Sequence, residues 1–259
     1  MALPSQVRAL TFDVFGTVVD WLTPVTASLT SAASRKLSSS SDLSSTTLTA
    51  LQTTNWTDFA RAWRASYGVF TRNFIPGKTS WKDIDTHHRD SLVDLLQGAG
   101  LGGVFTSQEI DELSKVWHFL TPWDDAVEGL RRLRAGYTVA TLSNGNTALL
   151  ADLDKHGGLG FDRLISAEEF HAYKPRAEVY RGACAVLEKE PGEVAMVAAH
   201  LGDLVGARAV GLRAVYVERH GEEEWRADEE RYGEAKKWVD VWIGKDEGGF
   251  EELARRLGL

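Results

Sequence analysis

Carboxylates, a lysine and small polar residues stand where apolar segments of this sequence end. They are Asp13 and Thr17, Ser143 and Asn144, Lys174, and His200 with Asp203. Two carboxylates, a lysine and small hydrogen-bonding groups can together bind and react with a ligand when they meet in one cleft. Singly, each residue also has a structural interpretation: aspartates cap turns, Ser-Asn-Gly forms a turn, and a lysine before proline lies at the surface. Their convergence in one predicted cleft favours an active site.

Short, nearly continuous apolar runs predict the strands that position these residues. The runs are 7–15, 137–144, 163–170, 194–201 and 212–219, with an edge strand at 240–243. Such runs are typical of parallel strands buried on both faces. Helical patterns at 125–136, 177–190 and 204–212 alternate with the later strands, and another closes the chain at 248–259. The alternation predicts a doubly wound, Rossmann-like α/β fold, which binds ligands at the carboxyl ends of its strands.

A different kind of sequence follows the first strand. Residues 22–120 contain no convincing strand and many tryptophan-rich, helix-compatible segments. We therefore predict an inserted helical cap at 22–120, with residues 1–21 and 121–259 forming the α/β core. The Ser/Thr-biased stretch 34–54 is expected to be a flexible loop. The charged run 221–238 is interpreted as a solvated surface.

Composition limits the classes of partner and cellular setting. The 259 residues carry a formal net charge of -8, which argues against a nucleic-acid partner but allows a small anionic substrate bound by local cations. The single cysteine, Cys184, forms no internal disulfide and is expected to be buried. Without a spanning apolar segment or a signal peptide, we expect no membrane association and a cytoplasmic location. Exposed cap tryptophans would suit a homodimer interface.

The polar motifs together resemble the haloacid dehalogenase superfamily of hydrolases. They are Asp-Val-Phe-Gly-Thr at 13–17, Ser-Asn-Gly at 143–145, Lys-Pro at 174–175 and Gly-Asp-x-x-Gly-Ala at 202–207. They span almost the whole core in the family's order, and a cap after the first strand also fits. Phosphatases of this superfamily usually carry an acid two residues after the nucleophile, where this chain has Phe15. An aromatic residue there resembles the 2-haloacid dehalogenase branch, whose halide product leaves without needing a proton.

The resemblance implies a hydrolytic dehalogenation without a cofactor. Asp13 would displace halide from an (S)-2-haloacid, and water would hydrolyse the resulting aspartyl ester to an (R)-2-hydroxyacid. Lys174 would keep Asp13 ionised, and Asp203 would orient the water. The other implied roles are hydrogen bonds to the carboxylates from Thr17 and Ser143, a pocket wall at Phe15, halide contacts from Asn144 and Arg64 (or Arg61), and a tyrosine near the lysine, Tyr180.

The chain departs from the family around its fourth strand. Established dehalogenases resemble Ser-Ser-Asn-x-Trp-Asp there, whereas residues 198–203 read Ala-Ala-His-Leu-Gly-Asp. Gly202 would admit larger substrates unless a cap residue such as Trp81 fills the space. His200 either orients water in place of the asparagine or is a histidine satisfied by backbone groups.

Two other functions stay open from the sequence. One is a magnesium-dependent small-molecule phosphatase that holds the metal with Asp13 and Asp203. The other is a non-catalytic descendant whose cap binds a small molecule or a partner. Magnesium dependence would separate the phosphatase from the dehalogenase.

Overall fold

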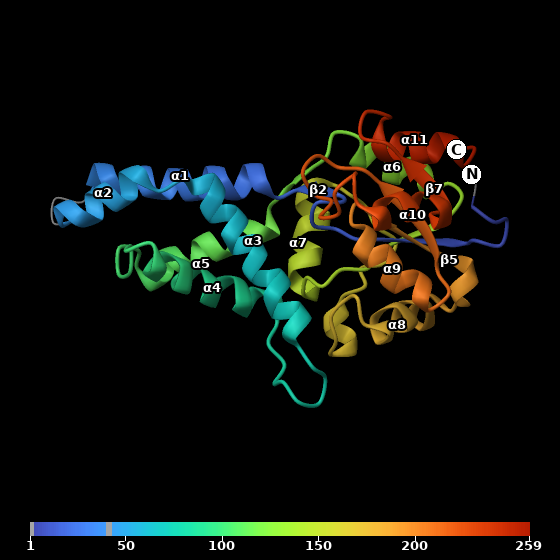
Figure 1. Ribbon diagram of the computed structural model, residues 1–259, viewed down its shortest axis with the longest axis horizontal. Helices are drawn as coiled ribbons and strands as arrows, with labels where there is room; N and C mark the ends of the chain where they lie inside the picture. Colours follow the sequence, from blue (N-terminus) through green and yellow to red (C-terminus); the bar gives the residue numbers. More distant parts are fainter. Residues whose placement is uncertain (1–2, 40–42) are drawn as a thin grey trace. The chain divides into compact units, whose positions relative to one another are not determined.

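The computed structural model describes residues 3–39 and 43–259 (Figure 1). The chain forms two compact units: the residues up to Asp20 together with Thr121–Leu259, and the segment Trp21–Leu120. Within the described ranges, no helix has both the length and the apolar character that crossing a bilayer requires.

The first unit is built on a parallel five-stranded sheet with the order β4-β1-β5-β6-β7. The strands are β1 (Ala9–Phe12), β4 (Thr138–Thr141), β5 (Val194–Ala198), β6 (Arg213–Val217) and β7 (Val241–Ile243). Phe12, the last residue of β1, pairs with Thr141 on one side and Val197 on the other. Three strands therefore end side by side, and the residues that follow them emerge at one edge of the sheet.

Helices flank this sheet and confirm the predicted α/β, Rossmann-like fold. They are α6 (Ala126–Leu133), α7 (Thr147–Gly157), α8 (Ala177–Leu187), α9 (Leu201–Ala209), α10 (Glu230–Trp238) and α11 (Gly249–Arg256). α6 packs against α11, and α8 against α9 (Figure 1). The short η3 (Pro191–Glu193) leads into β5. The free thiol Cys184, on α8, is buried as expected.

The strand predicted at 163–170 does not form. Only isolated bridges join Arg163 to Ala140 and Ser166 to Ser143, and a 3-10 helix, η2 (Ala167–Phe170), follows at once. Ser166 and Glu169 form a capping box in which each side chain accepts a hydrogen bond from the other's backbone N–H. This local cap gives those backbone groups partners within a helical turn, so the apolar run does not extend as a strand.

The second unit is helical, and in the sequence it lies between the two segments of the first unit. Its helices are α1 (Leu22–Ser39), α2 (Ser45–Thr53), α3 (Trp56–Asn73), α4 (Ile84–Gly98), α5 (Ser107–Ser114) and η1 (Lys115–His118). The chain leaves the first unit through β2 (Val19–Asp20) and returns through β3 (Thr121–Pro122), and these two strands pair antiparallel.

The Ser/Thr-biased stretch 34–54 is mostly helical, so the predicted loop was wrong; residues 40–42 lie outside the described residues. Ser38 and Ser39 hydroxyls donate to carbonyls four residues earlier, as does Thr49 in α2. Ser44 caps α2, accepting a hydrogen bond from Thr47 N. The hydroxyls thus bond within the helices or at their ends, rather than drawing the backbone into turns.

The tryptophans of the second unit form its core instead of an exposed face. Trp21, Trp56, Trp63 and Trp117 are buried, and Trp81 is half-buried. The Trp117 ring stacks on His88 at 4.5 Å and on Trp21 at 6.0 Å between centroids. The expectation of exposed tryptophans was therefore wrong, because these large rings are buried in the core, where they remove much apolar area from water.

Candidate active site

Asp13 is held at the end of β1 by its backbone and by both carboxylate oxygens. Its N–H donates to Val197 O at 3.0 Å, which continues the sheet pairing by one residue. Thr17 Oγ1 donates to Asp13 Oδ2 at 2.8 Å and itself accepts from Ala199 N at 2.9 Å. The turn between Asp13 and Thr17 requires Gly16, whose φ of +82° is costly for residues with a Cβ. This turn brings a hydroxyl onto the carboxylate.

The turn after Asp13 is also held from outside. Trp123 Nε1 donates to Gly16 O at 3.0 Å, and Arg219 Nε donates to Thr17 O at 3.0 Å. The Arg219 guanidinium forms a two-point ion pair with Asp125, at 2.5 and 2.8 Å. A planar guanidinium fixed in this way has little freedom, so it restrains the carbonyl it binds.

Lys174 joins Asp13 to the end of a second strand. Its Nζ donates to Asp13 Oδ1 at 2.9 Å and to Asp203 Oδ2 at 2.6 Å, and all three side chains are largely buried. Lys174 N donates to Asn144 Oδ1 at 2.7 Å, so an asparagine in the turn after β4 anchors the backbone of the lysine. One ammonium is thus shared by two carboxylates in a poorly hydrated setting, where the attraction between opposite charges is strong.

Asp203 lies in the first turn of α9. Tyr180, from α8, donates its hydroxyl proton to Asp203 Oδ1 at 2.5 Å, with Asp203 O at 3.1 Å. Tyr180 and Lys174 thus bind different oxygens of the Asp203 carboxylate, and together they fix its rotamer.

His200, between β5 and α9, contacts two carboxylates. Its Nδ1 lies 3.2 Å from Asp13 Oδ2, and its Nε2 lies 3.3 Å from Glu222 Oε2. The ring partners of His200 are acidic side chains rather than backbone groups, which speaks against a histidine satisfied by the backbone; its water-orienting role stays a prediction. These contacts also identify Glu222 as a site residue that the sequence analysis missed.

The start of the run 221–238 is therefore not the solvated surface that its charge indicated. Glu222 is 8% exposed and covers Gly16, where an added Cβ would lie 1.9 Å from Glu222 Oε2. Glu223 accepts hydrogen bonds from Leu201 N and Trp225 N, both at 2.7 Å. The one available signal was their place after β6, at the same edge of the sheet as Asp13, but no pattern within the run marks Glu222 as a site residue.

The charges of this network move the pKa values of its members apart. Burial would raise the pKa of Asp13, but the Lys174 ammonium and His200 outweigh it and hold the pKa well below its ordinary value. Burial raises the pKa of Asp203, assisted by the charge of Asp13 and opposed by Lys174. Against burial, Asp13 and Asp203 raise the pKa of Lys174. Asp13 is thus kept ionised, as a nucleophile must be, whereas the pKa of Asp203 is shifted in the opposite direction.

Two further predicted residues shape the turn after β4. Ser143 is fully buried and its Oγ accepts a hydrogen bond from Gly145 N at 3.1 Å. The Phe15 ring is 3% exposed and lies where a Cβ on Gly145 would come within 3.0 Å of Cε2. Phe15 is therefore an apolar wall packed on this turn, and Ser143 stabilises the turn itself.

Arg64 belongs to the second unit, in α3. Its guanidinium lies over the ring of Tyr67 at 4.6 Å and over that of Trp21 at 5.9 Å. Cation–π contacts of this kind orient the guanidinium against the aromatic faces. The halide contact predicted for Arg64 stays a prediction, as does the fallback to Arg61, which pairs with Asp58.

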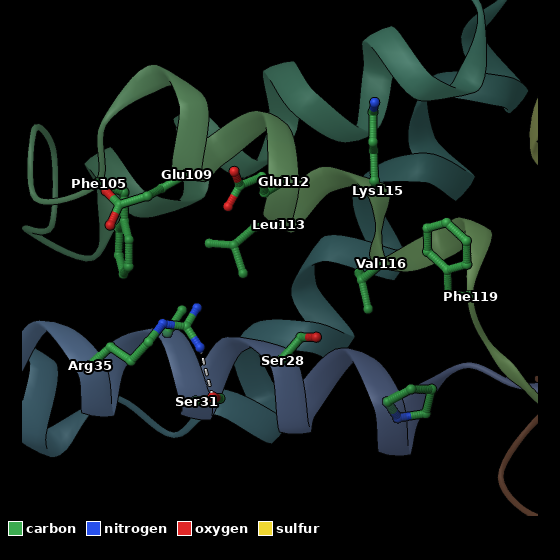
Figure 2. Close-up of a pocket in the computed structure, with 12 residues that line it drawn as sticks. Ser28, Ser31, Arg35, Phe105, Glu109, Glu112, Leu113, Lys115, Val116 and Phe119 are labelled. Carbon is green, nitrogen blue, oxygen red and sulfur yellow. Dashed lines mark hydrogen bonds between the residues drawn. The ribbon is translucent and has the colours of Figure 1, made fainter.

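A cavity of about 340 Å³ lies within the second unit, between α1 and the segment formed by α5 and η1 (Figure 2). Its lining carries both signs of charge, from Arg35 and Lys115 and from Glu109 and Glu112. Arg35 points across it while donating to Ser31 (Figure 2). The residues predicted for catalysis come from other segments. Among the described residues, no group of three or more His, Cys, Asp or Glu side chains is arranged to hold a metal ion.

A sequence model of the haloacid dehalogenase-like hydrolases matches residues 7–211. The chain belongs to this family of hydrolases, which confirms the resemblance carried by its motifs.

Curated relatives are 2-haloacid dehalogenases. (S)-2-haloacid dehalogenase 1 of Pseudomonas sp. (strain CBS-3) is 38% identical over 112 residues, 42% of this chain and 49% of the relative. (S)-2-haloacid dehalogenase 4A of Burkholderia cepacia is 38% identical over 114 residues, 43% of this chain and 49% of the relative. The chain thus spans about half the length of the curated relatives it matches.

Solved structures match over nearly the full chain. A defluorinating L-2-haloacid dehalogenase has a TM-score of 0.81 at 32% identity, covering 100% of this chain and 99% of that one. A second L-2-haloacid dehalogenase has a TM-score of 0.79 at 32% identity, covering 97% and 99%. The similarity therefore includes both compact units.

Proposed function

We propose that this protein is a cofactor-independent hydrolase of short (S)-2-haloacids that forms an aspartyl ester on Asp13. The observation that carries the proposal is the Asp13–Lys174–Asp203 network combined with Phe15 at the position of a general acid. The named activities of the relatives support the same reaction. The substrate class follows as a small anion with a halogen next to its carboxylate.

In the first step, an Asp13 oxygen attacks the halogen-bearing carbon. The C–O bond forms as the carbon–halogen bond breaks, and halide departs with the bonding electrons. Lys174 keeps the pKa of Asp13 low, so the nucleophile is ionised at neutral pH. Phe15 supplies apolar surface instead of a proton, which suits a leaving group that is a stable anion.

In the second step, water attacks the carbonyl carbon of the Asp13 ester and releases the (R)-2-hydroxyacid. His200 Nδ1 contacts Asp13 Oδ2 directly, whereas Asp203 is linked to Asp13 Oδ1 through Lys174. His200, within hydrogen-bond reach of the attacked carboxyl, and Asp203, on the other side of Lys174, would orient this water. Thr17 supports the reaction by holding Oδ2.

The donor set fits a magnesium-dependent phosphatase less well. The ammonium of Lys174 already bridges Asp13 and Asp203, and the other Asp13 oxygen faces Thr17 and His200. Magnesium prefers an octahedral shell of oxygen ligands, which a histidine nitrogen and an ammonium do not supply. Phe15 cannot protonate an alcohol leaving group. The completeness of the Asp13 network likewise argues against a non-catalytic descendant.

A cytoplasmic setting is part of the proposal. Cys184 is a free thiol, and free thiols persist in a reducing compartment.

Halide release tests the proposal. We expect the wild-type protein to release halide from L- but not D-2-haloacids in the presence of chelator, and Asp13→Asn to release none. Asn keeps the size of the side chain and removes the nucleophilic charge. Magnesium-dependent phosphate release without halide release would instead establish the phosphatase.

A further inference from the structure

His200 is sandwiched between two carboxylates that lie on opposite sides of its ring. Asp13 faces Nδ1 and Glu222 faces Nε2, at 3.2 and 3.3 Å. The histidine side chain is 24% exposed, so it also has access to solvent. Glu222 reaches the ring because Gly16 leaves room for its carboxylate. The arrangement has the order of a base and its orienting acid, in which one ring nitrogen works and the other is held.

The acidic groups that contact the imidazole come from the first unit. Asp13 from the end of β1 and Glu222 from the segment after β6 contact the ring. Glu223 lies close by and accepts a hydrogen bond from Leu201 N. Lys174 contacts the other oxygen of Asp13. Burial opposes protonation of His200, but the hydrogen bonds and charges of Asp13 and Glu222 raise its pKa to about 10. In the resting enzyme His200 is therefore an imidazolium, which cannot act as a base.

We propose that Glu222 is a positioning residue that makes His200 the base of the second step, and that esterification of Asp13 switches His200 into that role. This inference rests on the proposed dehalogenase function. Glu222, which lies outside the sequence motifs, thereby gains a role. The second step can start only after the first has removed the charge of Asp13.

The first half of the switch is the loss of the Asp13 charge. When the ester forms, Asp13 becomes neutral and the imidazolium loses one of the two anions that stabilise it. Its Nδ1 proton then passes to solvent through the exposed part of the ring. This proton accounts for the one acid equivalent released when a haloacid and water become a hydroxyacid and halide.

The second half restores the resting state. Neutral Nδ1 accepts a proton from water as the water oxygen bonds to the Asp13 carbonyl carbon. The ester C–O bond then breaks, and the other water proton ends on the hydroxyacid oxygen. The products are the Asp13 carboxylate, the hydroxyacid and the His200 imidazolium. Glu222 stabilises the cation that forms and keeps Nε2 as the donor, so that Nδ1 is the nitrogen that accepts.

A single-turnover experiment with Glu222→Gln tests the proposal, using 2-chloropropionate and the full chain. Glutamine keeps the shape and removes the charge. We expect the halide burst to stay within about 2-fold of wild type and ester hydrolysis to slow roughly 10- to 100-fold. Intact-protein mass spectrometry then shows the accumulated Asp13 ester. Glu224→Gln is the matched control, because Glu224 is exposed in the same acidic run and its variant should behave as wild type.

The pH profile of ester hydrolysis separates a catalytic arrangement from a packing role. Removal of the Glu222 charge should lower the apparent pKa of the base in the ester form, whereas Glu222→Asp should restore part of the rate and of the pKa. An intact halide burst in the same sample shows that the variant is folded.

The outcomes are distinguishable. If the wild-type protein releases halide and Glu222→Gln hydrolyses the ester at the wild-type rate with an unshifted pH profile, this inference is wrong while the proposed function stands. If the wild-type protein releases no halide from any 2-haloacid, the proposed function fails and this inference fails with it.

Discussion

At the scale of single residues, Lys174 decides whether Asp13 can react. It is the shared counter-ion of two buried carboxylates, so its removal would leave like charges facing each other. We expect Lys174→Ala to raise the pKa of Asp13 and to slow the halide burst at least about 100-fold at pH 7. The burst of the wild-type protein should be constant down to about pH 5, because its Asp13 pKa is low.

Burst rates from pH 4 to 9 measure this effect. Lys155→Ala removes an exposed lysine of α7 and serves as the control. A Lys174→Ala burst that matches this control across the range would contradict the role of the lysine.

A substitution at Gly16 tests the role of Glu222 without changing Glu222 itself. In Gly16→Ala the Cβ would lie 1.9 Å from Glu222 Oε2, so we expect the glutamate to leave His200 and the Asp13 ester to accumulate. Gly221→Ala is the matched control: its φ of +78° imposes a similar backbone strain of about 1–2 kcal/mol, yet nothing lies within 4 Å of its Cβ. Ester accumulation in both variants, or in neither, would count against a specific effect on Glu222.

At the scale of elements, two buried histidines of α4 make the stability of the second unit sensitive to pH. Burial lowers the pKa of His87 to about 4, with Lys82 adding to the effect, and burial lowers the pKa of His88 as well. Folding therefore favours the neutral rings. Their contribution to stability is complete above pH 6.5, the ordinary value, and is lost as the pH falls toward 4.

We expect acidification from pH 7 to pH 4 to remove on the order of 2 to 3 kcal/mol of stability through His87 alone. His87→Gln should flatten that part of the pH dependence of thermal unfolding. His156→Gln, at an exposed position of α7, should leave it unchanged. Equal slopes in all three proteins would show that His87 does not contribute.

At the scale of the whole molecule, the two compact units can be followed separately. Five of the nine tryptophans lie in Trp21–Leu120, whereas the single cysteine lies in the other unit. Burial raises the pKa of Cys184 to about 11 and leaves its side chain 4% exposed. Since the thiolate is the reactive form, alkylation of the native protein at pH 8 should be negligible.

Iodoacetamide labelling during denaturant unfolding should therefore report the α/β unit, while tryptophan fluorescence is weighted toward the helical unit. Val186→Cys, at a 43%-exposed position of the same helix, should be labelled at once and shows that the reagent is active. Rapid labelling of Cys184 in the native protein would mean that α8 opens on its own.

The sequence by itself determined the α/β fold and the edge of the sheet where the chemistry lies. Buried parallel strands require continuous apolar runs, and polar residues just after them stand out, as Asp13 and Asp203 do. Such signals depend on residues that are close together in the sequence, so they can be recognised without a structure.

Tertiary structure alone decided where local signals compete or where partners lie far apart. The run 163–170 is apolar enough for a strand, but its capping box forms a helical turn, and the hydroxyls of 34–54 bond within helices that pack against the rest of their unit. Glu222 looked like one charge in a solvated run. Its role depends on His200 and Gly16 meeting it across the sheet edge, and no pattern within a short segment encodes that contact.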